Sequence, residues 1–187
     1  MVRRIHRVVQ HRSGISGIEA MTLFTNHAFP RHSHDHIGIG MMTHGAQRSW
    51  SIIGQVESEA GDVIMVNPGE IHDGMPVGNA ARGWRILYLD PAFVARELAD
   101  ETTGGELIVR PVARDPQLAE HVTRLFVQME NAGRDGLALE ESLVCCLMRL
   151  LHKHGVRGPR TACSSPSVSK AIRRLDTRRK CRHRSPS

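Results

Sequence analysis

The sequence predicts a mainly β protein with a smaller α-helical part, arranged as an antiparallel sandwich or barrel followed by two helices. Short apolar stretches separated by turn signals fill the first ninety residues, which is typical of strands. Two amphipathic helical periodicities follow them. The chain has 187 residues, of which 40% are hydrophobic and 24% charged. It therefore has room for one such domain with its own core and a short appendage.

Four apolar stretches carry the strand prediction. They are His36–Thr43, Arg48–Ile53, Asp62–Val66 and Trp84–Leu89. Turn-forming pairs recur beside them, namely Gly45-Ala46, Gly54-Gln55, Pro68-Gly69 and Gly78-Asn79. Antiparallel strands reverse direction at this spacing, so we expect the barrel to cover about residues 10–90.

Two helices are predicted between about residues 115 and 154. The first covers about Asp115–Asn131, and Pro116 suits its first turn. Its apolar face consists of Leu118, Val122, Leu125, Phe126 and Met129. The second covers about Leu139–His154 and ends before Gly155, with an apolar face of Leu143, Cys146, Leu147, Leu150 and Leu151. We expect both helices to pack on the barrel and to form a homodimer contact.

The net charge of +6 is located at the end of the chain. Residues 1–156 hold 15 Lys and Arg against 18 Asp and Glu, a net charge of −3. Residues 157–187 hold 10 basic residues and one acid, a net charge of +9. Composition predicts a linker over Gly155–Ser167, then a short helix over about Ser167–Arg174 and a basic disordered tail. The tail would attract nucleic acid nonspecifically, whereas the body has no electrostatic footprint for it.

The cysteines and the apolar runs predict a cytoplasmic protein. Cys145, Cys146, Cys163 and Cys181 form no CxxC pair, and the adjacent two suit a helix core better than redox chemistry. This use of cysteine fits a reducing compartment. The longest apolar run, Leu143–Met148, is far too short for a bilayer span, and the first residues lack a secretory apolar segment. We therefore expect no membrane partner.

A cluster of histidines is the most specific local feature. The segment Pro30–His36 contains His32, His34 and His36 at two-residue steps. Residues two apart on a strand project from the same face, so a strand here would present the three imidazoles together. Three converging imidazoles are a candidate metal site. The competing interpretation is that they line a pocket or bond to one another.

The surrounding residues resemble the first motif of the cupin superfamily, which runs Gly, five residues, His-x-His, three or four residues, Glu, six residues, Gly. His32, His34 and Gly45 are in register with it. Asn26 stands in place of the leading Gly, and Gly38 in place of the Glu. The resemblance implies a double-stranded β-helix barrel.

The second cupin motif runs Gly, five residues, Pro-x-Gly, two residues, His, three residues, Asn. Gly61, Gly69 and His72 match it, while Asn67 and Pro76 replace the Pro and the Asn. The resemblance thus implies His32, His34 and His72 as metal ligands for zinc, nickel or iron, without the family's carboxylate. His36 could substitute for that ligand if the strand register allowed it.

A longer series of segments resembles the sensing domain of AraC/XylS-family transcription regulators. The series comprises residues 30–40, the Asn67–Gly74 turn, Trp84–Pro91 and the two helices, within about residues 10–177. The resemblance implies a cupin-like domain over residues 1–156 that binds a small-molecule effector, forms homodimers and is joined to two helix-turn-helix motifs. Ser167–Thr177 resembles the first helix of that DNA-binding part, which should continue for about a hundred residues. We expect a truncated regulator that lacks its reader of specific DNA.

An effector would lie inside the barrel, against apolar walls with a few polar groups. Gly38 and Gly40 would leave space there. The candidate binding residues are Arg31, His34, His36, Met42, Trp50, His72, Trp84, Arg85 and Tyr88. Arg31 could pair with a ligand carboxylate or stay solvated. The aromatic side chains could instead be core residues, and Arg85 could be a surface residue.

The chain is expected not to be an enzyme. It contains no phosphate-binding loop, no GxSxG elbow, no HExxH helix and no dinucleotide fingerprint. The alternative is a small metal-dependent cupin enzyme using the three-histidine site, against which the missing carboxylate at Gly38 weighs. Clustered imidazoles could also act as a pH switch without metal.

Overall fold

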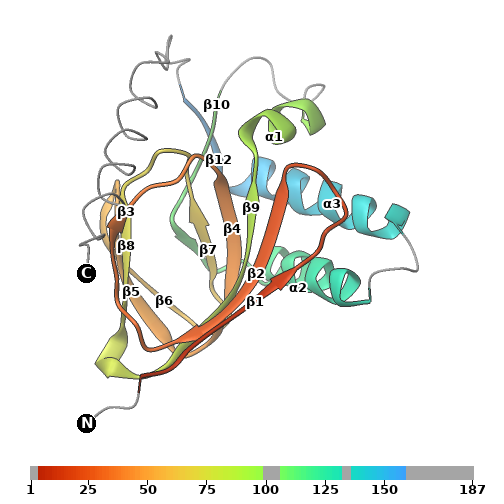
Figure 1. The fold of residues 1–187 in the computed structure, drawn as a ribbon. Helices are drawn as coiled ribbons and strands as arrows, with labels where there is room; N and C mark the ends of the chain where they lie inside the picture. Colours follow the sequence, from red (N-terminus) through yellow and green to blue (C-terminus); the bar gives the residue numbers. More distant parts are fainter. Residues whose placement is uncertain (1–3, 99–105, 132–135, 159–187) are drawn as a thin grey trace, which may run out of the picture.

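The computed structural model describes residues 4–98, 106–131 and 136–158. The predicted short helix and basic tail fall on residues 159–187 and lie outside this part of the chain. Two antiparallel sheets form a barrel, and helices cover one side of it (Figure 1). The predicted mainly β barrel with helices is confirmed.

The larger sheet has six strands in the order β1-β2-β9-β4-β7-β11. Their bounds are β1 (His6–His11), β2 (Ile18–Thr25), β9 (Arg82–Leu89), β4 (Ile37–His44), β7 (Val63–Val66) and β11 (Val112–Ala113). β9 lies between β2 and β4, and it pairs antiparallel with both. This central strand joins the chain's first hairpin to the rest of the barrel.

The smaller sheet has four strands in the order β3-β8-β5-β6. Their bounds are β3 (Phe29–His32), β8 (His72–Pro76), β5 (Ala46–Ser51) and β6 (Gly54–Glu59). A short helix, η1 (Val77–Asn79), links β8 to β9. In Figure 1 this sheet faces the six-stranded sheet across the barrel interior.

Strand alternation divides the buried apolar residues of the larger sheet into two cores. One face of the sheet looks into the barrel and carries Leu23, Met42, Ile64, Trp84 and Ile86. The opposite face carries Ala20, Ile39, Val63, Met65 and Leu87, and these residues share a core with the helices. The inner set lines the barrel, and the outer set fixes the helices to it.

Three helices accompany the sheets: α1 (Pro91–Glu97), α2 (Pro116–Glu130) and α3 (Gly136–His154). α2 starts and ends where predicted, with Asp115 as N-cap and Asn131 as C-cap. α3 starts three residues earlier than predicted. Figure 1 shows α2 and α3 side by side, with α2 against the outer face of the six-stranded sheet. α3 contacts α2, β10 (Glu106–Val109) and β12 (Gly155–Gly158), and its buried residues share a core with the sheet. The expectation that both helices pack on the barrel is confirmed.

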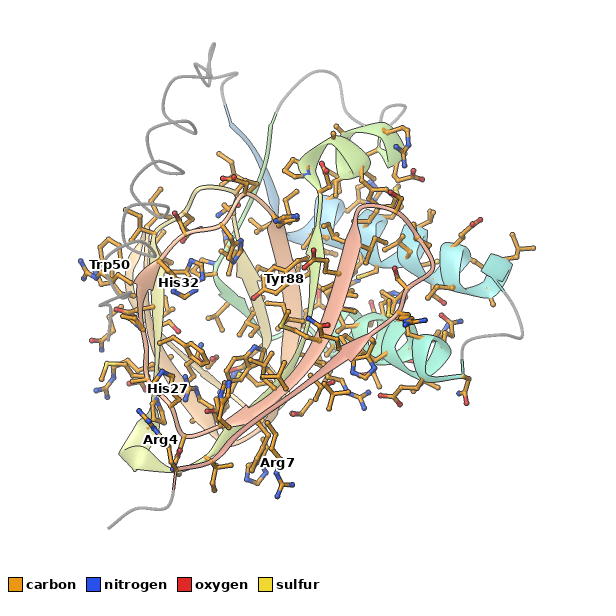
Figure 2. The ribbon with its side chains drawn as sticks, viewed as in Figure 1. Arg4, Arg7, His27, His32, Trp50 and Tyr88 are labelled. Carbon is orange, nitrogen blue, oxygen red and sulfur yellow. The ribbon has the colours of Figure 1, made fainter. Side chains whose placement is uncertain are left out.

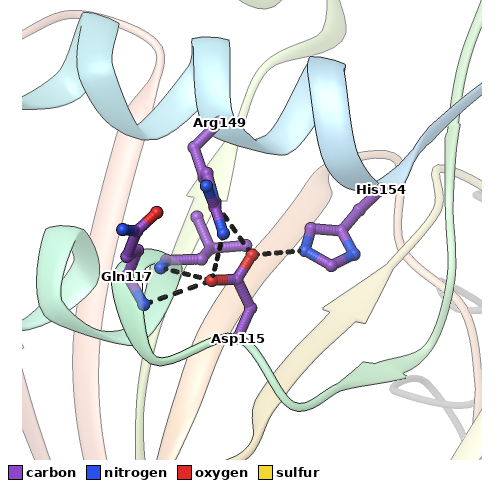
Figure 3. Close-up of polar contacts among 5 residues, drawn as sticks. Asp115, Gln117, Arg149 and His154 are labelled. Atoms are coloured by element: carbon purple, nitrogen blue, oxygen red, sulfur yellow. Dashed lines mark hydrogen bonds and ion pairs between the residues drawn. The ribbon is translucent and has the colours of Figure 1, made fainter.

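A buried carboxylate joins the two long helices (Figure 3). Asp115 caps α2 by accepting hydrogen bonds from the backbone N–H groups of Gln117 and Leu118. From α3 it receives two bonds from Arg149, each 2.9 Å long, and faces the ring of His154 at 2.8 Å. Burial alone would raise the pKa of Asp115, but the bonds from Arg149, His154 and Leu118 outweigh it and hold the pKa well below 3.8. The start of α2 is thereby fixed to the end of α3.

One boundary prediction was wrong. Residues 155–158, expected to open a linker, form strand β12 (Gly155–Gly158), which pairs with β10 (Glu106–Val109). The glycines predicted the end of α3 correctly, but they do not prevent an extended chain from pairing with a strand about fifty residues away. Local composition carries no signal for such a distant partner.

No helix within the described residues is long and apolar enough to cross a membrane.

Candidate functional site

A cavity of about 260 Å³ lies between the two sheets of the barrel. Both walls contribute to its lining, which consists of Met21, Leu23, Phe29, His32, Gln47, Ile64, Val66, His72, Asp73, Gly74, Trp84, Ile86 and Tyr88. Figure 2 shows His32 on the four-stranded wall and Tyr88 on the six-stranded wall, on opposite sides of the interior. Mostly apolar walls with a few polar groups are what a small organic ligand requires.

A larger hollow of about 730 Å³ lies at the connection between β1 and β2. All of its lining residues belong to the segment 10–21, which is one hairpin. A single hairpin brings no groups together from different parts of the fold. The barrel cavity, which five or more strands build, is therefore the better candidate for a specific site.

Three imidazoles meet at one end of the cavity, where His34 and His72 are half-buried and His32 is exposed. The ring of His72 on β8 lies 4.4 Å from that of His32 and 5.0 Å from that of His34, between centroids. Tyr88 on β9 contacts His34 from the opposite wall, at 4.8 Å. The cluster thus draws on β3, β8, β9 and the loop after β3.

The expected register of the three histidines on one strand was wrong. β3 ends at His32, β4 begins at Ile37, and His34 and His36 lie in the loop between them. β3 and β4 belong to different sheets, so the chain must change direction here. His36 contributes its backbone carbonyl to the cluster, facing His34 Nδ1 at 3.2 Å.

Backbone carbonyls fix the ring tautomers of this cluster. The Nδ1 atoms of His32 and His72 lie 2.8 and 2.9 Å from the carbonyl oxygens of Pro30 and Glu70. A carbonyl only accepts, so each Nδ1 carries the hydrogen and each Nε2 keeps its lone pair. His34 follows the same pattern, and its buried Nε2 has no hydrogen-bond partner. The cluster therefore presents three acceptor nitrogens for a donor group or a metal.

Burial lowers the pKa of His34 and of His72 from 6.5, and neighbouring imidazoles lower it further. Both rings are thus neutral at neutral pH. On the opposite wall, burial raises the pKa of Tyr88, with Glu19 adding to the shift. Its hydroxyl stays protonated and can donate.

The lowered histidine pKa values predict a loss of stability on acidification. As the pH falls toward 6.5, the unfolded chain binds protons that the half-buried His34 and His72 of the folded protein do not bind. The free energy of unfolding should therefore fall from about pH 7.5 toward the lowered pKa. Chemical denaturation across this range measures the slope. His72→Gln should flatten it, whereas His152→Gln, on the exposed surface of α3, should not. Equal slopes in all three proteins would contradict this role of the cluster.

The cluster fits a metal ion in its donor chemistry but not in its arrangement. Imidazole nitrogens suit zinc, nickel or iron. However, in the described ranges no group of three or more His, Cys, Asp or Glu side chains is placed so that it could hold a metal ion. The metal site at His32, His34 and His72 therefore stays a prediction.

The structure separates the other predicted binding residues. Trp84 and Tyr88 line the cavity, and Met42 is fully buried in the inner core beside it. Arg31 stacks over Trp50 at 4.3 Å on the outer side of the four-stranded sheet, where Figure 2 shows Trp50. The expectation that these two line the main cavity was wrong, because the alternation of β5 turns Trp50 outward.

The prediction that Arg85 lines the cavity was also wrong. It follows Trp84 on β9, so its side chain leaves the opposite face of the sheet. There it pairs with Glu130 of α2 at 3.1 Å and lies over the ring of Phe126. Arg85 thus helps to hold α2 on the sheet.

The sequence analysis missed Arg82, which is fully buried beside the cavity. Its guanidinium donates to Gln47 Oε1 at 2.8 Å and to the backbone carbonyls of His27 and Gly74 at 3.0 and 3.1 Å. Arg82 lies two residues before Trp84, and residues two apart on a strand share a face. This spacing could have placed Arg82 on the inner face of β9.

A barrel with an inner cavity of this kind defines a small-molecule binding domain. The chain belongs to the family of AraC-like ligand binding domains, whose profile matches residues 13–147. It thus carries an effector-sensing domain of the AraC type, as the sequence predicted. No curated protein matches the chain at a significant level.

Solved structures show likenesses of limited extent. A variant of oxalate decarboxylase from Bacillus subtilis is 14% identical, with a TM-score of 0.42 over 49% of this chain and 27% of that chain. The Cnp3 cupin domain of Schizosaccharomyces pombe is 10% identical, with a TM-score of 0.43 over 52% and 75%. A cupin superfamily protein from Desulfitobacterium hafniense is 11% identical, with a TM-score of 0.41 over 48% and 84%. The chain thus spans only about a quarter of the oxalate decarboxylase.

Proposed function

We propose that the barrel cavity is the effector site and that its occupancy controls transcription through a homodimer. The carrying observation is the cavity of about 260 Å³ in which His32 and His72 from one sheet face Trp84 and Tyr88 from the other. His34 completes the polar end of the site. The domain binds and releases its effector unchanged, and it acts in the cytoplasm, where the regulated DNA is.

The dimer contact is proposed on the outer surface of α2 and α3. Apolar side chains remain exposed there: Val127 at 45%, Leu137 at 75% and Val144 at 46%. α2 also packs directly against β4 and β9, and the inner face of β9 lines the cavity. An effector that prefers one arrangement of these strands would shift the dimer population accordingly. We propose that a separate domain recognises specific DNA sequences. Residues 4–158 alone should therefore not discriminate between DNA sequences.

A thermal-shift screen of small organic molecules tests the effector site. Gly38 lies beside the cavity, because a Cβ there would lie 3.3 Å from Val66 Cβ, 3.5 Å from Ile86 Cδ1 and 3.6 Å from Tyr88 Cε1, three side chains of the lining. Gly38→Leu should therefore fill the cavity and abolish stabilisation by every hit, whereas Gly38→Ala should retain part of it. A hit that stabilises the Gly38→Leu chain as much as the parent binds elsewhere, and the proposed site would be refuted if every hit did so.

A metal-dependent cupin enzyme is the second candidate, favoured by the buried Nε2 of His34 that has no partner. Its test is elemental analysis of purified protein, repeated with His32, His34 and His72 changed to Ala. Stoichiometric zinc, nickel or iron that these changes remove would establish a metal site and justify an activity screen. Protein that stays free of metal after reconstitution would rule out this candidate.

A further inference from the structure

The barrel holds one buried cation without a carboxylate partner. Arg82 has no accessible surface, and no described Asp or Glu carboxylate lies within 4.0 Å of its guanidinium. Burial lowers the pKa of Arg82 only to about 10, so it is charged at neutral pH. A buried charge is costly when hydrogen bonds to neutral groups are its only compensation.

The neutral groups that hold Arg82 are also walls of the cavity. Gln47 and Gly74 accept its hydrogen bonds, and its Cζ lies 5.2 Å from the ring centroid of Trp84 and 5.7 Å from that of Phe29. All four residues line the cavity. The charge of Arg82 thus lies one layer behind the cavity surface, where little water screens it.

Arg82 also decides which way Gln47 points. A guanidinium only donates, so the bond from its Nε fixes Oε1 of Gln47 toward Arg82 and turns the amide NH₂ away. One amide hydrogen goes to Ser49 Oγ, at 2.8 Å. The other has no protein partner among the described residues. A Cβ at Gly74 would lie 3.1 Å from Gln47 Oε1, so this glycine makes room for the arrangement.

The remaining acidic group of the lining does not cancel this charge. Asp73 Oδ1 accepts from the backbone N–H of Trp50 at 2.6 Å, and Oδ2 faces Arg31 at 3.7 Å. Asp73 is therefore compensated on the outer side of the sheet. The positive charge of Arg82 therefore acts on the end of the cavity near Gln47, and the imidazole of His72 offers an acceptor at the other end. The two ends are about 7 Å apart, the length of the two strand residues from His72 to Gly74.

Resting on the proposed effector site, we infer that the cavity selects a small organic carboxylate, whose anionic group accepts from Gln47 beside Arg82. The apolar body of the ligand lies between Phe29, Ile86 and Trp84, and a hydroxyl on it could donate to the histidine end. A neutral molecule of the same shape lacks the attraction to Arg82 and binds more weakly.

The test compares phenylacetate with phenylacetamide, which has the same shape without the charge. Trp50→Phe leaves Trp84, in the cavity wall, as the single tryptophan of the chain, so its fluorescence reports occupancy. We expect phenylacetate to bind at least about ten-fold more tightly. Gln47→Glu in this background places a carboxylate on Arg82 and should remove the preference. Gln55→Glu, the same change at an exposed position of β6, should leave it intact.

Thermal unfolding checks that the Gln47→Glu variant is folded. Its new carboxylate pairs with the buried charge of Arg82, so the variant should melt at or above the melting temperature of the parent. Equal affinities for the two probes, or a preference that survives Gln47→Glu, would overturn the inference and leave the effector site standing. A lack of any response to either probe would also overturn it. The effector site itself fails only if the screen against Gly38→Leu locates every hit outside the cavity.

Discussion

Asp115→Ala is expected to lower the free energy of unfolding by about 3–5 kcal/mol, the range for breaking a buried ion pair by removing one partner. The change removes the cap of α2 and leaves the guanidinium of Arg149 and the ring of His154 without their carboxylate. Such a loss is a large part of the stability of an ordinary domain. Urea denaturation followed by circular dichroism measures it.

Asp90→Ala provides the matched control. Asp90 caps α1 by accepting from the backbone N–H of Ala92 at 2.7 Å, but it is exposed and has no buried cation to neutralise. Its loss should cost about 1 kcal/mol, the usual value for a cap. If the two variants were destabilised equally, the bonds of Asp115 to α3 would contribute nothing, and the account of how α2 and α3 are joined would be wrong.

Gly40→Ala is expected to destabilise the barrel by about 3 kcal/mol, the upper end of overpacking. A Cβ on Gly40 would overlap the carbonyl oxygen of Arg85 and lie 3.0 Å from Ile86 Cα. These are backbone atoms of β9, which is paired on both sides and cannot move without displacing β2. The expectation that Gly40 leaves space for a ligand was therefore wrong, because the backbones of β4 and β9 approach here.

Gly38→Ala on the same strand and face is the control for Gly40→Ala. Its Cβ would meet only side-chain atoms, the nearest being Val66 Cβ at 3.3 Å. Side chains can adjust by a few tenths of an ångström, so the cost should stay below about 1 kcal/mol. Thermal and urea unfolding of the two variants side by side measure the difference. A Gly40→Ala chain as stable as Gly38→Ala would contradict the close approach of β4 and β9.

The parts of the fold that local sequence could predict are those with strong local signals. Apolar periodicity with Asp115 and Pro116 at its start placed α2 to the residue, and turn pairs with apolar stretches placed β4, β7 and β9 closely. The bond from Asp115 to Arg149 spans 34 positions, and β12 pairs with a strand about fifty residues away. Such contacts depend on how the elements pack, for which one sequence carries no local pattern.

The candidate site was predicted in part for the same reason. The motif spacing identified His32, His34 and His72, which the barrel brings together, and Trp84 and Tyr88, which line the cavity. The other site residues depend on which face of a strand each side chain leaves. Arg85 lies on the outer face of β9, while Arg82, three residues earlier, lies on the inner face. The predicted strand began at Trp84, so Arg82 fell outside it, and the alternation of side chains along the strand was not applied to Arg82.

The measurement that tests the central claim most directly is NMR chemical-shift mapping with the strongest compound from the thermal-shift screen. An effector in the barrel should shift the indole N–H of Trp84 and the backbone amides of His72 and Gly74. Gly38→Leu should remove these shifts. Shifts confined to α2, α3 or the β1–β2 hairpin, with the barrel interior unperturbed, would contradict the account.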